Sequence, residues 1–221
     1  MCKRAKNAMK CLVGVLLCLS LVACGGNTEK ESVFDVAKDA YGKIEAAYAI
    51  TEQFGSDVYE AWRIGIYDVD ELMSNGVGHL ASELSLSEDD IVKGIALVLT
   101  DDGREPIQLT KSRANLYFRF YEDSMFSFCV LIVANAYEAN GKSAEAQGNL
   151  DSAKELMKRM SEKYSDYEHY PNLKKYFTTT KSFFAFCQDP TGSFEQVKDT
   201  INDYKNDARE YRSDLDYIFE E

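Results

Sequence analysis

FEQVKDTINDYKNDAREYRSDLDYIF, residues 194–219, is the stretch that decides the fold class of this 221-residue chain. Its apolar and aromatic residues recur at alternating steps of three and four, and the positions between them are mostly charged or polar. The stripe consists of Phe194, Val197, Ile201, Tyr204, Ala208, Tyr211, Leu215 and Ile218. A narrow seam of this kind predicts a helix that lies nearly antiparallel along its neighbours. We therefore expect an up-and-down helical bundle.

The same helical period continues through the rest of the chain from residue 33 onward. Two helix starts are marked by capping boxes, Ser87 with Asp90 and Ser193 with Gln196. We expect one all-α domain over residues 33–221, built from about six to seven helices. The expected helices cover residues 33–67, 70–85, 87–100, 111–140, 143–164, 171–187 and 193 onward. Two alternatives stay open: a split of the first helix at Gly55, and a β-hairpin at the Asp-Gly pair of DDGREP.

MFSFCVLIVANAY, residues 125–137, is the most apolar part of the expected domain. Because it is apolar nearly all round and too short to span a membrane, we expect it to be the central helix. Cys129 lies in it, and Cys187 lies in the similar context FFAFCQDP. In an exported protein these two residues could form a disulfide, and they fit equally well as buried free thiols. Both interpretations stay open.

The first 23 residues have the composition of an export signal, with four basic residues before the apolar run CLVGVLLCLSLVA. The next residue is Cys24, and LVAC at 21–24 resembles the bacterial lipobox at every position. The resemblance implies cleavage after residue 23 and lipidation of Cys24, palmitate included. Residues 24–32, CGGNTEKES, would then form a flexible tether. The mature protein is thus expected on the cell membrane, lipid-anchored at the extracytoplasmic face.

The chain is acidic, with 25 Lys and Arg against 37 Asp and Glu and a net charge of −12. Loss of the four basic residues of the signal would take the mature chain to about −16. This balance argues against nucleic acid and against docking on anionic lipid, because both need a basic face. It identifies no partner, since acidic surfaces often serve only solubility.

Motifs for catalysis or cofactor binding are absent from the sequence. His79 and His169 are the only histidines, and neither lies in a nucleophile motif or at metal-ligand spacing. The glycines of SNGVGHL follow no expected strand, so they predict no phosphate loop. We therefore expect a protein that is not an enzyme and has no metal or cofactor.

Aromatic residues supply the one candidate interaction surface. Tyr164, Tyr167, Tyr170 and Tyr176 lie in the run KYSDYEHYPNLKKY, and Trp62 is the single tryptophan. Tyrosine suits wet interfaces, so these five residues are candidates for contact with a sugar, a peptide or a partner helix. Packing in the core and at helix ends is the competing explanation.

Two resemblances bear on the fold. VYEAWRIGIYD at 58–68 and YFTTTKSFFAFCQDPTGSFEQVKDTINDYKNDAREY at 176–211 resemble uncharacterised small helical lipoproteins of Gram-positive bacteria, in which a Pro-x-Gly-Ser turn precedes a final polar helix. That resemblance implies a helical fold and a membrane address, and no activity. VANAYEANGKSAEAQGNLDSAKEL at 133–156 more weakly resembles a single tetratricopeptide hairpin, without the usual proline.

These features predict a lipid-anchored, non-catalytic module that binds a protein or an envelope component. The alternative is an extracytoplasmic binding protein for a small ligand or peptide held between helices. We expect a monomer, and a dimer through the seam of residues 194–219 is the alternative, because a coiled coil needs the same seam.

Overall fold

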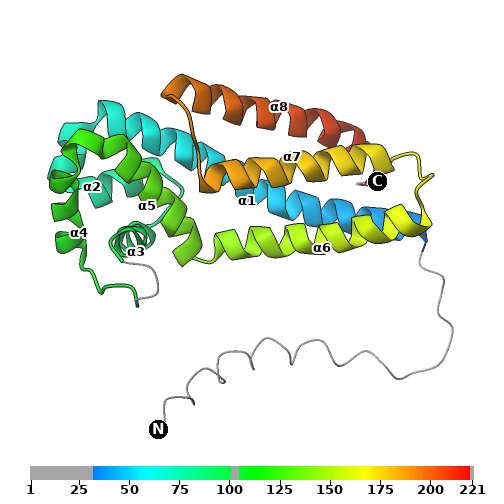
Figure 1. Cartoon of the computed structure of the whole chain (residues 1–221), viewed down its shortest axis with the longest axis horizontal. Helices are drawn as coiled ribbons and strands as arrows, with labels where there is room; N and C mark the ends of the chain where they lie inside the picture. Colours follow the sequence, from blue (N-terminus) through cyan, green and yellow to red (C-terminus); the bar gives the residue numbers. More distant parts are fainter. Residues whose placement is uncertain (1–31, 101–104, 220–221) are drawn as a thin grey trace, which may run out of the picture. The chain divides into compact units, whose positions relative to one another are not determined.

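Helix α1, Val33–Tyr67, is the longest helix of the computed structural model, which describes residues 32–100 and 105–219 (Figure 1). It begins at a capping box in which the side chains of Ser32 and Asp35 each accept from the other residue's backbone N–H. It continues for 35 residues without a break at Gly55, a length of about 52 Å. The expected signal peptide, Cys24 and the tether up to residue 31 lie outside the described residues.

Helices α6 (Lys142–Lys163), α7 (Tyr170–Gln188) and α8 (Phe194–Phe219) lie lengthwise against α1 (Figure 1). α7 also contacts both α6 and α8. Much of the α8 seam is buried within the chain, namely Val197, Ile201, Ala208 and Leu215. The predicted all-α bundle is therefore confirmed, and the described residues contain no strand.

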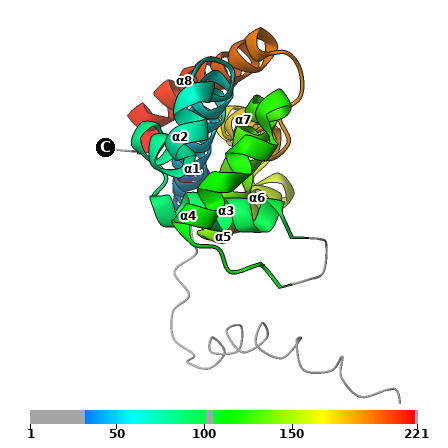
Figure 2. The same ribbon diagram turned by 90° about the vertical axis from the view of Figure 1, so that its left-hand side faces the viewer.

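Helices α2 (Val69–Glu83), α3 (Glu88–Val98), α4 (Lys111–Tyr117) and α5 (Met125–Ala139) gather around the C-terminal half of α1 (Figure 2). α5 packs on both α1 and α3, and more than half of its residues are buried. The prediction that this helix is central is wrong, because α1 contacts α2, α5, α6, α7 and α8, whereas α5 leaves Leu131 50% exposed. The chain turns from α5 into α6 at Gly141, whose φ of 82° lies in the left-handed region that glycine adopts readily.

The helix predicted over residues 111–140 is interrupted by two 3₁₀ turns, η1 (Phe118–Phe120) and η2 (Glu122–Ser124). Tyr121 between them has φ −111° and ψ 21°, outside the helical region. Aromatic residues stand at positions 117, 118, 120 and 121, and in a continuous helix they would point in several directions. On either side of the break, Phe118 and Tyr121 both pack on Phe128, with ring centroids at 5.4 and 4.1 Å. It also raises the number of α-helices in the described residues to eight, against the predicted six to seven.

The segment before α4 is neither helix nor strand from residue 105 to residue 110. The hairpin alternative is therefore not formed in the described part of this region. Its second half contains Pro106, which has no N–H for a strand ladder.

A cluster of charged and aromatic side chains joins the first part of α1 to α7 and α8. Arg212 of α8 forms ion pairs with Glu45 of α1 at 3.0 Å and with Asp216 one turn further on at 3.4 Å. The hydroxyl of Tyr176 donates to Glu45, and the hydroxyl of Tyr41 donates to Asp216. Burial raises the pKa of the Glu45 carboxyl, although the hydrogen bond from Tyr176 and the charge of Arg212 lower it. The cluster holds the end of α8 against the start of α1.

Replacing Glu45 by glutamine is expected to change how stability depends on pH. The pKa of Glu45 is raised in the folded state, so the folded protein holds this proton more tightly than the unfolded chain does. The resulting stabilisation is full below the ordinary pKa of 4.5 and is lost as the pH rises through the folded value. Wild type should therefore lose stability relative to Glu45→Gln between acidic and neutral pH.

Urea unfolding at a series of pH values measures this difference in the free energy of unfolding. Glu155→Gln, at an exposed carboxylate on α6, is the control. A difference between wild type and Glu45→Gln that stays constant from below pH 4.5 to neutral would contradict the role given to Glu45.

Candidate functional site

The five aromatic residues expected to form an interaction surface do not lie on one surface. Tyr176 is 0% exposed, and Trp62 is 7% exposed and stacks on a phenylalanine of α5 at 5.6 Å. Tyr164, Tyr167 and Tyr170 are half-buried at the connection between α6 and α7. Trp62 and Tyr176 are core residues. For Trp62 the spacing already indicates this, because it continues the apolar stripe of Val58 and Ala61 on α1.

Both cysteines of the domain are free, buried thiols in the structure. Burial raises the pKa of the Cys129 thiol to about 12, and burial likewise raises the pKa of Cys187. Because the thiolate is the reactive form, neither side chain is suited to act as a nucleophile.

The two histidines lie apart, each beside one carboxylate. His79 of α2 lies 3.2 Å from Asp68, which also pairs with Arg63 at 3.2 Å. His169 lies 3.1 Å from Glu168 in the α6–α7 connection. Within residues 32–100 and 105–219, no group of three or more His, Cys, Asp or Glu side chains is placed to hold a metal ion.

Several exposed apolar side chains line a groove formed by α4, η1 and the segment before them. We call this surface the α4 face. It consists of Ile107, Leu109, Arg113, Leu116, Tyr117 and Phe120, together with Gln108, and it encloses a groove of about 380 Å³. Phe120 is 77% exposed, Leu116 is 50% exposed and Ile107 is 40% exposed. Contiguous apolar exposure of this kind marks sites of interaction in soluble domains.

The α4 face arises because this short helix has apolar residues on two sides. Thr110 caps its start by accepting from the backbone N–H of Arg113. Ala114 and Phe118 are buried, so their side of the segment packs against the core. Arg113 and Leu116 are three apart on the other side, so they share a face that the domain leaves uncovered.

Two arginines lie at or beside the α4 face, and the exposed carboxylates of Glu105 and Glu122 adjoin it in the sequence. Arg113 lies in the groove and Arg119 is exposed next to Phe120, and neither forms an ion pair within the part of the chain that the structure describes. Lys111 pairs with Glu88 of α3 at 2.5 Å. The groove therefore combines apolar walls with one guanidinium group, that of Arg113.

Sequence reasoning missed this surface because it expected one continuous central helix. A usable signal was present in LYFRFY, residues 116–121. Positions 116 and 118 lie about 200° apart around a helix, so one core cannot bury both Leu116 and Phe118. One apolar side chain had to remain exposed.

A second concavity is polar, a cleft of about 520 Å³ between α1, the α2–α3 connection and α8. Asp57 lines it from α1, and Lys198 and Lys205 line it from α8. The Lys205 ammonium donates to Ser56 at 2.8 Å, and Lys198 lies 3.6 Å from Glu195. The cleft offers charges of both signs to a small polar molecule.

No protein-family model, curated protein or solved structure matches this chain. None of the described helices is both long and apolar enough to cross a membrane. The site must therefore be judged on its own chemistry.

Proposed function

We propose that this protein is a lipid-anchored, non-catalytic interaction module on the extracytoplasmic face of the cell membrane, and that the α4 face binds a partner protein. The observation that carries the proposal is the exposed apolar stripe of Leu116 and Phe120 beside a groove. Large exposed apolar side chains cost solubility unless a partner covers them. The LVAC motif that ends at Cys24 supports the anchor.

The chemistry of the α4 face suggests what the partner presents. Arg113, Leu116 and Tyr117 stand at i, i+3 and i+4 on α4, and Phe120 follows them in η1. A short apolar face of this kind can meet a partner helix or an extended segment. The guanidinium of Arg113, which makes no ion pair within the described residues, favours a carboxylate at the edge of the contact. We therefore expect a partner segment with apolar residues flanked by Asp or Glu.

The double substitution Phe120→Ser with Leu116→Ser is expected to weaken partner binding by at least about tenfold, because buried apolar and aromatic anchors dominate such interfaces. The measurement is retention of envelope proteins on the immobilised domain, quantified against the partner that wild type retains. Tyr217→Ser is the matched control, because Tyr217 on α8 has the same 77% exposure as Phe120.

Both variants should unfold at nearly the wild-type temperature, since the altered side chains are exposed. The proposal fails if the double variant retains the same proteins as wild type. It also fails if Tyr217→Ser lowers retention equally.

A small-ligand binding protein is the second candidate, and the polar cleft beside Asp57 is the observation that favours it. The two functions are distinguished by thermal unfolding. A polar small molecule that raises the melting temperature, with an effect lost in Lys205→Ala and kept in the α4-face variant, would favour the cleft.

A further inference from the structure

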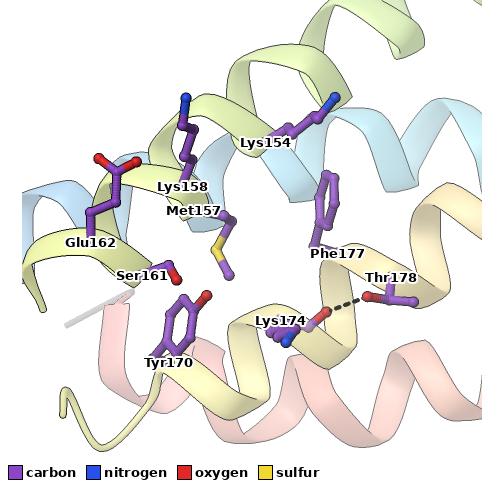
Figure 3. A pocket seen from close by; sticks show the side chains of 9 residues that line it. All are labelled: Lys154, Met157, Lys158, Ser161, Glu162, Tyr170, Lys174, Phe177 and Thr178. Carbon is purple, nitrogen blue, oxygen red and sulfur yellow. Dashed lines mark hydrogen bonds between the residues drawn. The ribbon is translucent and has the colours of Figure 1, made fainter. Parts of the chain in front are cut away.

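A groove of about 320 Å³ lies between the second half of α6 and the first half of α7 (Figure 3). Met157 points from α6 toward α7, and Phe177 points from α7 toward α6. Tyr170, one of the expected surface tyrosines, lines the end of the groove near the α6–α7 connection. The floor is thus apolar and partly aromatic. We call this site the α6–α7 groove.

The polar lining of the α6–α7 groove is mainly basic. Lys154 and Lys158 project from successive turns of α6 with their side chains pointing away from α7, and Lys174 lies on α7 at the opposite rim (Figure 3). These three ammonium groups make no ion pair or side-chain hydrogen bond within the described residues. Glu162 is the single acidic side chain that lines the groove.

The basic character extends along α7. In its 19 residues this helix carries three lysines and no Asp or Glu, in a chain whose net charge is −12. The net acidity of the whole chain opposes docking on anionic surfaces, and the α6–α7 groove is a local exception to it. A site with this composition is suited to a ligand that combines an anionic group with an apolar part.

The groove lies at the end of the domain where the described chain begins. Phe34 of the first turn of α1 packs on Phe219 at 5.6 Å, and Tyr41 lies 6.2 Å from Tyr176, between ring centroids. Tyr176 is one helical turn and a half beyond Tyr170, which lines the groove. The first turns of α1 and the groove therefore belong to the same end of the bundle.

We propose that the α6–α7 groove binds the phosphate headgroups of anionic membrane lipids. Lys154, Lys158 and Lys174 lie around the rim and attract the phosphates of neighbouring headgroups, and Met157 with Phe177 accommodates the apolar part of a lipid between them. The inference rests on the proposed anchor, because a short lipidated tether before Ser32 would bring this end of the domain close to the membrane. Basic residues near an anionic leaflet each add to the attraction.

In the test, the domain is coupled to a lipid in vesicles, and the reactivity of each lysine shows whether the membrane covers it. Every residue of the hydrophobic core lies between Val36 and Phe219, so the chain from residue 24 onward retains the whole core. Cys24 of this mature chain is coupled to a maleimide lipid, since the other two thiols are buried. Acylation of each lysine is then measured by mass spectrometry on vesicles of phosphatidylcholine with phosphatidylglycerol, and on vesicles of phosphatidylcholine alone.

We expect Lys154, Lys158 and Lys174 to be acylated at least about fivefold more slowly on the anionic vesicles than on the neutral ones. Lys93, which is exposed on α3, should react at the same rate on both. In the variant Lys158→Gln with Lys174→Gln, Lys154 should lose its protection. The matched variant Lys93→Gln with Lys111→Gln should leave the protection of Lys154 unchanged.

Three results would overturn the proposal. Equal protection on neutral vesicles would show proximity without headgroup recognition. Equal protection by inorganic phosphate without vesicles would show a site for a soluble anion, and unprotected lysines on anionic vesicles would show no contact. Chemical coupling supplies the anchor in every arm of this experiment, so the proposed anchor is tested separately. In cells, the Cys24→Ser variant should be absent from the membrane fraction, in which wild type is expected.

Discussion

Replacing Asp57 by alanine is expected to destabilise the protein by about 3–5 kcal/mol. Asp57 is 3% exposed, and its carboxylate accepts from four groups. The donors are the Gln53 amide at 3.2 Å, the Ser85 backbone N–H at 3.1 Å, the Ser85 hydroxyl and the Tyr137 hydroxyl at 2.9 Å. This one side chain therefore links α1 to α5 and to the α2–α3 connection. Truncation would leave the buried hydroxyl of Tyr137 without its carboxylate acceptor.

Urea unfolding of Asp57→Ala, Asp57→Asn and Tyr137→Phe measures how much each hydrogen-bonding group contributes to the free energy of unfolding. Asp57→Asn retains the shape and one acceptor oxygen, so its loss should be intermediate. Tyr137→Phe removes one donor and should cost about 1 kcal/mol. A loss below 1 kcal/mol for Asp57→Ala would show that the network contributes little.

Replacing Gly65 by alanine is expected to destabilise the protein by about 2–3 kcal/mol, because α1 and α5 touch there through their backbones. A Cβ atom at Gly65 would lie 2.4 Å from the Cα of Phe126 and 2.8 Å from its backbone nitrogen. Backbone atoms of a helix cannot relieve a clash by a change of rotamer, as a flexible side chain can. The two helices would therefore have to move apart.

Gly42 in the same helix provides the matched control. A Cβ atom at Gly42 would meet nothing within 4 Å. Since alanine is favoured over glycine in a helix interior, Gly42→Ala should stabilise the protein by about 0.5–1 kcal/mol. Opposite signs of the two effects in thermal or urea unfolding confirm the close approach. A stabilising Gly65→Ala would contradict it.

Helix positions were predictable where the signal is local. Capping at Ser87 and Ser193 marks the starts of α3 and α8, and the structure forms both boxes, with Asp90 and Gln196 as partners. The seam of residues 194–219 predicted the face that α8 buries. These signals depend only on neighbours within one or two helical turns.

The features that failed prediction depend on tertiary contacts. The break at Tyr121 exists because aromatic residues on several sides of the chain compete for one core, and Phe128 accepts two of them. The spacing of Trp62 placed it in the apolar stripe of α1, so its burial was predictable, whereas the spacing of Tyr176 fitted a surface or a core. Phe120 stands two positions from the buried Phe118, about 200° around a helix, so its exposure could have been predicted from LYFRFY, whereas the break itself could not.

The central claim is that the α4 face binds a partner while the protein is anchored. A photo-crosslinking phenylalanine analogue placed at position 120 in the full chain in living cells tests it most directly, with the analogue at position 217 as the equally exposed control. We predict a discrete crosslinked species of higher mass from position 120 in the membrane fraction and none from position 217. The same species from both positions, or none from position 120, would contradict the claim.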